Sequence, residues 1–289
     1  MKREKFTVND FHTKYPDDDA CLDELFRSKY GNKTPCPSCN KEAHFYKVTD
    51  RKCYSCEHCG YQIHPLADTI FHKSSTSLKN WFFAIFLFAN SRNGVAAKEL
   101  ERQLGVTYKC AWRIAKQIRL LFQQSKEPLS NTVEVDETYV GGKSSGTRGR
   151  GAKGKTSVVG IVERQAEVRA KVTANTKSST VLPLIRENVK IGTRVITDEY
   201  LSYNRVSENG YTHDRIKHIS KQYVLDDIHT NTIEGFWSQL KRSLHGTHHA
   251  VSPKYLQHYV DEFAYRYNQR NAFSHLFHGM VLKAQQPVL

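Results

Sequence analysis

The sequence predicts a chain of several parts, in which a cysteine-rich lobe and a helical segment precede an α/β domain with a mixed sheet. Three observations predict this class. Five of the seven cysteines fall between positions 36 and 59, apolar residues recur at helical spacing from position 77, and Val- and Ile-rich runs alternate with helical patterns after position 131. A chain of 289 residues is long enough for two or three such units, because domains usually run about 100–200 residues.

The cysteine-rich lobe has the spacing of a metal site. Two C-x2-C pairs, separated by sixteen residues, are formed by Cys36 with Cys39 and by Cys56 with Cys59. Four thiolates in this arrangement match a structural Zn²⁺ site that leaves no open position for water. Cys53 forms a further C-x2-C pair with Cys56 and could replace a member of the second knuckle. Gly60, directly after Cys59, favours Cys56 and Cys59 as the ligands.

A helical segment follows the cysteines. Residues 81–89 are its most apolar stretch, but nine residues are far fewer than the ~20 that cross a bilayer. We therefore expect a buried core helix and no membrane partner.

The first residues, MKREKFTVNDF, do not form an export signal. We therefore expect the protein to reside in a reducing compartment, where its cysteines stay free of disulfides.

Two shorter helical patterns, residues 95–105 and 106–122, form a candidate helix-turn-helix pair. Gly105 and Thr107 supply the turn and the helix N-cap that this motif requires. The second helix is predicted to expose a basic face suited to the phosphates and base edges of DNA, although a solvated amphipathic pair would show the same pattern. The basic residues are Lys109, Arg113, Lys116 and Arg119.

Residues 123–131 are polar and contain one proline, which places a domain boundary there. The expected domains are 1–75 with an N-terminal helix and the ribbon, 76–125 with the helix-turn-helix, and 130–289 with the α/β fold. The last of these is predicted to hold strands at 132–136, 156–163, 167–173 and 193–197, a helix at 178–189, and long helices at 229–244 and 252–268.

Carboxylates end two of the predicted strands. Glu134 and Asp136 share one face of the first strand because strand side chains alternate, and Asp198 follows another apolar run. Glu234 lies in a later helix, and Lys241, seven residues on, points the same way. Two strand-end aspartates and a helix glutamate are the hard oxygen ligands that Mg²⁺ or Mn²⁺ requires. Turn-forming aspartates at strand ends are the alternative explanation.

The charge of the chain favours a polyanionic partner. Forty-three Lys and Arg against 29 Asp and Glu leave a net charge of +14, which indicates nucleic acid as the partner. A basic loop without acids follows the first strand at 141–155, and we expect it to lie against DNA. Its basic residues are Lys143, Arg148, Arg150, Lys153 and Lys155.

Four segments carry a family resemblance: VEVDETYVGGK, VITDEY, HTNTIEGFWSQLKRSLHGTHHAVS and YVDEFAYRYNQR. Together they resemble the DDE-class transposases of bacterial insertion sequences, in the group akin to eukaryotic Merlin elements. The resemblance extends upstream through the ribbon and ADTIFHKSSTSLKNWFFAIF, so it covers nearly the whole chain. It implies an RNase H-like mixed sheet flanked by helices, preceded by a small zinc ribbon and a helix-turn-helix domain.

The resemblance also implies an activity. Such an enzyme uses divalent metal to hydrolyse phosphodiesters at the inverted-repeat ends of its element and joins the freed 3′-OH to target DNA. By resemblance the catalytic triad is Asp136, Asp198 and Glu234, with Lys241 as a basic companion and Asn231 as the alternative third ligand. Glu137, beside Asp136, is expected to support the site from outside or to be solvated.

Paired-end cutting implies at least a homodimer on DNA, and the expected location is the nucleoid in a bacterial cytoplasm. A zinc-ribbon regulator without catalysis and a nuclease without strand transfer are the competing hypotheses.

Overall fold

The computed structural model describes residues 6–142, 154–216, 227–271 and 276–287. Contacts divide the chain into two compact units. The first contains residues 1–91, 95–121 and 272–289, and the second contains residues 92–94 and 122–271. No helix in the described ranges is long and apolar enough to span a membrane.

The first unit opens with two short helices, α1 (Val8–Lys14) and α2 (Asp18–Tyr30). Pro16 lies between them and interrupts the helical pattern of the opening segment. Asp17 caps α2 by accepting a hydrogen bond from the Ala20 N–H, and α2 ends at Gly31, which adopts a φ of 69° that glycine tolerates.

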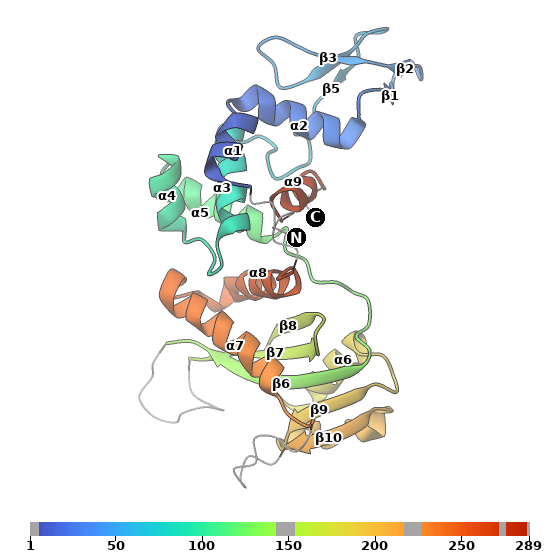
Figure 1. Ribbon diagram of the computed structural model, residues 1–289, viewed down its shortest axis with the longest axis vertical. Helices are drawn as coiled ribbons and strands as arrows, with labels where there is room; N and C mark the ends of the chain where they lie inside the picture. Colours follow the sequence, from blue (N-terminus) through green and yellow to red (C-terminus); the bar gives the residue numbers. More distant parts are fainter. Residues whose placement is uncertain (1–5, 143–153, 217–226, 272–275, 288–289) are drawn as a thin grey trace. The chain divides into compact units, whose positions relative to one another are not determined.

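The cysteines lie among five short strands beside α2 (Figure 1). These are β1 (Thr34–Pro35), β2 (Glu42–Ala43), β3 (Phe45–Lys47), β4 (Tyr54–Cys56) and β5 (Gln62–Ile63). β1 pairs with β2 alone, whereas the other three strands form a separate antiparallel sheet in the order β3-β4-β5. Phe26 of α2 stacks on Tyr54 with ring centroids 4.0 Å apart, so aromatic packing holds the small sheet on the helix.

The apolar segment at 81–89 forms the core helix α3 (Leu78–Asn90). It packs against α9 (Leu276–Ala284), whose Phe277 ring contacts Phe82 edge-on. By sequence position α9 falls in the predicted 130–289 domain, but its packing is with the first unit.

The candidate helix-turn-helix segment consists of α4 (Ala97–Leu104) and α5 (Tyr108–Arg119), which pack on each other. Gly105 takes the left-handed conformation that ends α4, and Thr107 caps α5 through the Cys110 N–H, as the sequence predicts. Whether this pair binds DNA stays a prediction.

One expectation for the basic face of α5 is wrong. Lys109 and Arg113 are exposed and Lys116 is half-buried, but only 4% of Arg119 is exposed. The Arg119 guanidinium donates to the Val95 carbonyl at 2.9 Å and lies 5.3 Å from the ring centre of Phe88. Arg119 therefore stabilises the helices internally and does not belong to an exposed basic surface.

A five-stranded mixed sheet forms the centre of the second unit, in the order β10-β9-β6-β7-β8. The strands are β6 (Thr132–Val140), β7 (Thr156–Glu163), β8 (Val168–Thr173), β9 (Arg194–Asp198) and β10 (Thr212–Ile216). β6, β7 and β8 are antiparallel, whereas β6, β9 and β10 run parallel. The predicted mixed sheet is thus confirmed.

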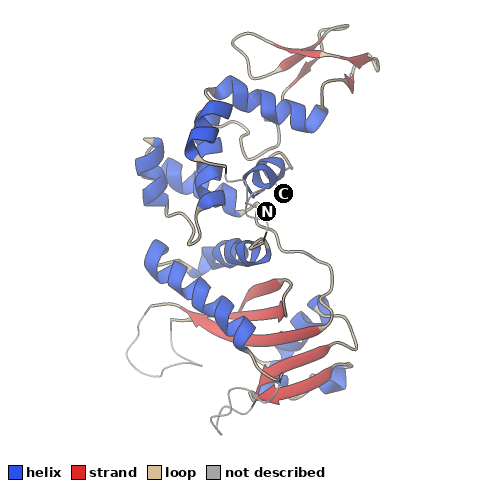
Figure 2. Cartoon of the chain, viewed as in Figure 1, coloured by secondary structure: helices blue, strands red, loops and turns tan. Residues whose placement is uncertain are grey.

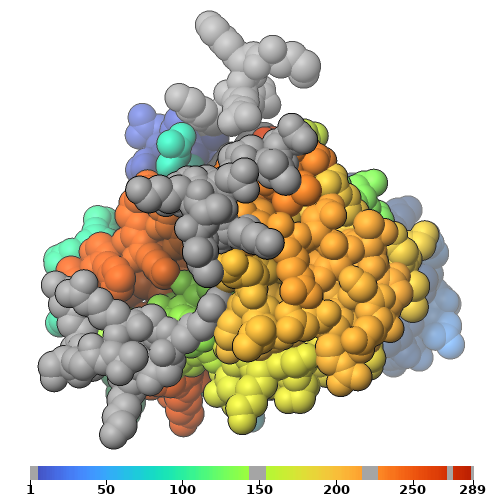
Figure 3. All heavy atoms as spheres, turned by 90° about the horizontal axis from the view of Figure 1, so that it is seen from below, coloured from blue at the N-terminus to red at the C-terminus, as the bar shows by residue number. Residues whose placement is uncertain are grey.

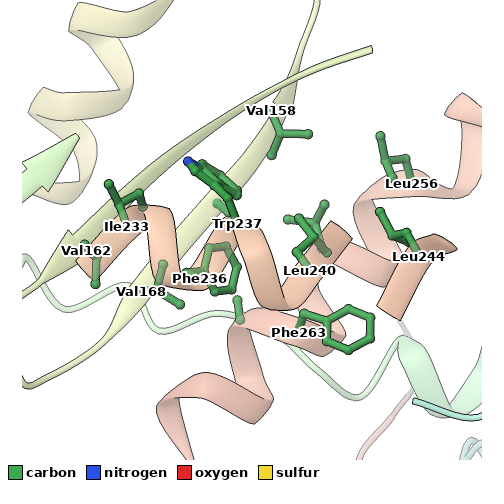
Figure 4. Close-up of a cluster of buried hydrophobic side chains, with 13 residues drawn as sticks. Val158, Val162, Val168, Ile233, Phe236, Trp237, Leu240, Leu244, Leu256 and Phe263 are labelled. Carbon is green, nitrogen blue, oxygen red and sulfur yellow. The ribbon is translucent and has the colours of Figure 1, made fainter. Parts of the chain in front are cut away.

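Helices cover both faces of this sheet (Figure 2). α6 (Ser178–Asn188) packs on one face, where Val133 and Val135 are buried. α7 (Asn231–Ser243) and α8 (Leu256–Asn268) pack on the other, around the apolar cluster in Figure 4. The alternation of β6 therefore directs Val133 and Val135 to α6, and the carboxylates of Glu134 and Asp136 to the α7 side.

The free edge of β8 is covered by side-chain amides. Its outward backbone groups bond to Asn268 at Val168 (2.7 and 3.1 Å), to Gln124 at Ala170 (2.8 and 2.9 Å) and to Gln257 at Val172 (2.7 Å). Each amide offers a donor and an acceptor, as a neighbouring strand would. This arrangement satisfies the edge and blocks pairing with a second sheet.

Replacing Gln124 by alanine is expected to lower the free energy of unfolding of the second unit by about 1–2 kcal/mol, because the Ala170 N–H loses its partner and the Ala170 C=O keeps only the hydrogen bond from Gln257 at 3.1 Å. Native-state hydrogen exchange of β7 and β8 measures the change. Gln123→Ala, at an exposed neighbouring amide, is the control and should change little. Equal effects of the two substitutions would show that the amide pairing does not stabilise the edge.

Candidate active site

Asp136, in the middle of β6, and Asp198, the last residue of β9, lie close together on neighbouring parallel strands. β6 pairs with β9 so that Glu134 lies opposite Ile196, and Asp136 and Asp198 each follow two residues later. One carboxylate oxygen from each of Asp136, Glu137 and Asp198 lies within 4.8 Å of the others. The fold therefore brings together two acids that are 62 positions apart in the chain.

A pocket of about 410 Å³ opens at this group of acids. It is lined by Asp136, Glu137, Thr138, Asp198, Thr230, Glu234, Trp237, Ser238 and Lys241. Figure 3 views this end of the unit and shows the green part of the chain, which includes β6, between orange α7 and the gold segment around residue 200. Glu234 and Lys241, two helical turns apart on α7, both reach the pocket wall.

Glu234, the predicted third acid of the triad, lies apart from the group formed by Asp136, Glu137 and Asp198. Glu234 is exposed, its carboxylate accepts a hydrogen bond from Thr230 Oγ1 at 2.9 Å, and it is outside the group of oxygens within 4.8 Å. Asn231, the alternative ligand, is the exposed first residue of α7 and is not among the residues that line the pocket.

The pocket concentrates negative charge. Burial and the neighbouring carboxylates of Glu137 and Asp198 raise the pKa of Asp136 to about 7. Burial lowers the pKa of Lys241, with Asp136 acting against this shift and Lys155 acting with it. Crowded carboxylates of this kind, open to solvent on one side, suit a hard divalent cation.

Glu137 belongs to the site more closely than the sequence predicts. Only 8% of Glu137 is exposed, and its carboxylate accepts a hydrogen bond from the Tyr203 hydroxyl at 2.7 Å. Tyr203 is fully buried, and burial together with Glu137 raises its pKa well above the ordinary value. β6 stays paired with β7 through Val140, so alternation still directs Glu137 to the side of Tyr203. Because pairing with β9 ends at Glu134, the Glu137 carboxylate can nevertheless lie close to those of Asp136 and Asp198. The adjacent Asp-Glu pair was the signal in the sequence.

Glu134 anchors the helix that carries Glu234. It is fully buried, and its carboxylate accepts from the backbone N–H groups of Thr232 and Ile233 at 2.9 and 3.0 Å, in the first turn of α7. It also accepts from the Thr232 hydroxyl and from Arg164 Nε at 2.8 and 2.7 Å. A carboxylate at a helix N-terminus is favourable, so Glu134 fixes α7 against β6.

The four predicted cysteines also meet in the structure. One sulfur atom from each of Cys36, Cys39, Cys56 and Cys59 lies within 4.8 Å of the others. Burial opposes ionisation of Cys36, but hydrogen bonds from the backbone at Cys39 and Ser38 outweigh it and lower its pKa to about 6, which favours the thiolate that binds metal. Cys53 is outside this group, and its thiol lies 3.6 Å from Gln62 Oε1.

The chain is similar to transposase proteins along most of its length. Residues 128–268 match the ISXO2-like transposase domain, and residues 16–62 match the transposase zinc-ribbon domain. An uncharacterized protein in transposable element ISH50 of Halobacterium salinarum is 27% identical over 263 residues, which cover 84% of this chain and 88% of that protein. An uncharacterized transposase-like protein of Haemophilus influenzae is 32% identical over 104 residues, covering 36% of this chain and 83% of the relative. With its cysteine cluster and its acidic pocket, the chain belongs to the family of ISXO2-like transposases.

Proposed function

We propose that this transposase cleaves the ends of its insertion sequence and joins the resulting 3′-OH ends to target DNA, using divalent cations held by Asp136, Asp198 and Glu234. The observation that carries the proposal is the convergence of Asp136 and Asp198 in one pocket whose wall includes Glu234 and Lys241. The three antiparallel strands followed by parallel β9 and β10 support an RNase H-like core.

The residues fit Mg²⁺ or Mn²⁺. Asp136, Asp198 and Glu137 offer hard oxygens close together, and the pocket has space for water and a phosphate group beside them. Bound cations would supply charge stabilisation to the phosphate oxygens during in-line displacement. Asp136 and Asp198 would hold one side of this centre from the rigid sheet, and Glu234 would approach it from α7.

Basic residues around the pocket would orient the DNA. Lys241 lines the pocket, and the Lys155 ammonium lies close enough to contribute to the lowered pKa of Lys241. Both positive charges can therefore face the same phosphodiester. Lys109 and Arg113 of α5 provide a second exposed basic surface in the first unit. Lys143, Arg148, Arg150 and Lys153, predicted to contact DNA near the cut, lie outside the described residues.

An end-cleavage and joining assay tests this function. The full chain is incubated with Mg²⁺ or Mn²⁺ and labelled DNA that carries the inverted repeats flanking the gene, together with a target plasmid. We expect cation-dependent cleavage at the repeat ends and joined products. Cleavage without joined products would indicate a nuclease, and binding without cleavage would indicate a regulator.

The cysteine cluster should hold one structural Zn²⁺ per chain. Cys36→Ser is expected to lose this zinc and to unfold the small sheet, because folding of such sites depends on the metal. Metal analysis and hydrogen exchange of residues 34–63 measure both effects. Cys53→Ser is the matched control and should keep its zinc. If Cys36→Ser kept the zinc and Cys53→Ser lost it, Cys53 and not Cys36 would be the ligand.

A further inference from the structure

The indole of Trp237 joins α7 to the first catalytic acid. Only 4% of Trp237 is exposed, and its Nε1–H donates to Asp136 Oδ2 at 3.0 Å. Figure 4 shows the ring rising from α7 toward the strands, between Ile233 and Val158. The ring therefore has an apolar environment on its carbon atoms and a single polar edge directed at Asp136.

The neighbouring strand is shaped to admit this ring. Gly160 of β7 pairs with Asp136 of β6. A Cβ atom added at Gly160 would lie 2.5 and 2.6 Å from two carbons of the Trp237 ring and 2.9 Å from Ile233 Cδ1. Gly160 has no positive φ, so its lack of a side chain provides space and not conformational freedom. The strand that faces Asp136 thus leaves room for the indole at this position.

We propose that Trp237 is a positioning residue that holds the Asp136 carboxylate in the orientation needed to bind a divalent cation; this inference rests on the proposed function. Three carboxylates within 4.8 Å repel one another when ionised, and this repulsion favours rotation of the Asp136 carboxylate away from Asp198 and Glu137. The hydrogen bond from the indole N–H to Oδ2 opposes this rotation, together with a backbone hydrogen bond at Glu137. Partners that orient a metal ligand in this way typically contribute about 10- to 100-fold to metal affinity or activity.

The competing explanation is that Trp237 only fills the apolar cluster between α7 and the sheet. The two explanations differ in one atom, because packing needs the two rings and positioning needs the N–H. Benzothienylalanine keeps both rings and replaces the N–H by sulfur. Installed at position 237 alone by nonsense suppression, it removes the hydrogen bond and leaves the packing intact.

The experiment measures Mn²⁺ affinity of the zinc-loaded full chain from the EPR signal of free Mn²⁺, with the thermal unfolding midpoint measured in parallel. We expect benzothienylalanine at 237 to weaken Mn²⁺ binding about tenfold without a change in midpoint. Gly160→Ala, which displaces the ring, should weaken binding as well, whereas Gly235→Ala, where an added Cβ meets nothing within 4 Å, should not.

Phe236→Leu serves as the packing control. Phe236 is buried beside Trp237 in the same cluster, so its truncation should lower the midpoint and leave Mn²⁺ affinity unchanged. If Asp136→Asn abolishes Mn²⁺ binding but benzothienylalanine at 237 leaves it unchanged, the positioning role of Trp237 is overturned and the proposed metal centre stands. Unchanged affinity in Asp136→Asn would overturn the proposed metal centre itself.

Discussion

Asp136→Asn is expected to reduce cation-dependent cleavage of element ends by roughly 10³-fold or more while leaving DNA affinity within about twofold. The substitution preserves the size of the side chain but removes one negative charge from the three acids that meet where β6 passes the end of β9. The loss should fall on the chemical step, because Asp136 lies in the pocket and the exposed basic residues remain. Single-turnover cleavage and a separate binding titration measure the two effects.

Asp261→Asn provides a matched control in the same unit. Asp261 is also largely buried, which raises its pKa, but its carboxyl group accepts from Gln124 and Gln257 and lines a different pocket. Cleavage should therefore survive this substitution. If Asp136→Asn cleaves as well as Asp261→Asn does, the acids at the strand ends are not the catalytic centre.

Glu134→Ala is expected to lower the free energy of unfolding of the second unit by about 3–5 kcal/mol. Glu134 is fully buried and accepts hydrogen bonds from Arg164, from the Thr232 hydroxyl and from two backbone N–H groups of α7. Its removal leaves the largely buried Arg164 charge without its carboxylate and the start of α7 without its anchor. Glu134→Gln keeps an acceptor and should cost less, about 1–3 kcal/mol.

Hydrogen exchange of the β6 and β7 amides reports on this unit alone and measures the loss. Glu208→Ala is the control, because its ion pair with Arg205 is exposed and should contribute no more than about 1 kcal/mol. Similar losses for Glu134→Ala and Glu208→Ala would contradict the anchoring role of the buried carboxylate.

Much of the second unit can be predicted from periodicity. The expected strand at 156–163 and helix at 178–189 agree closely with β7 and α6. β7 is a short apolar run buried on both faces, and α6 buries Val181 and Ile185, four residues apart, on one face. β10 escapes prediction because its residues, THDRI, include a single buried apolar side chain, Ile216, on an edge strand. β6 also continues to Val140, beyond the predicted end at 136.

The candidate site divides in a similar way. Asp136 and Asp198 could be predicted because each directly follows apolar β-forming residues, although only Asp198 ends its strand, and parallel pairing of β6 and β9 brings them together. The hydrogen bond from Trp237 to Asp136 could not, because it depends on how α7 packs across the sheet. The burial of Arg119 could not be predicted either, because helical spacing alone does not tell which basic side chain on α5 is exposed and which bonds within its own unit.

Anomalous diffraction from crystals of the protein grown with Mn²⁺ tests the central claim most directly. We predict a Mn²⁺ peak bound by the carboxylates of Asp136 and Asp198, and the loss of this peak in Asp136→Asn. A pocket without a peak at saturating Mn²⁺, or Mn²⁺ bound only at sites away from these two aspartates, would contradict it.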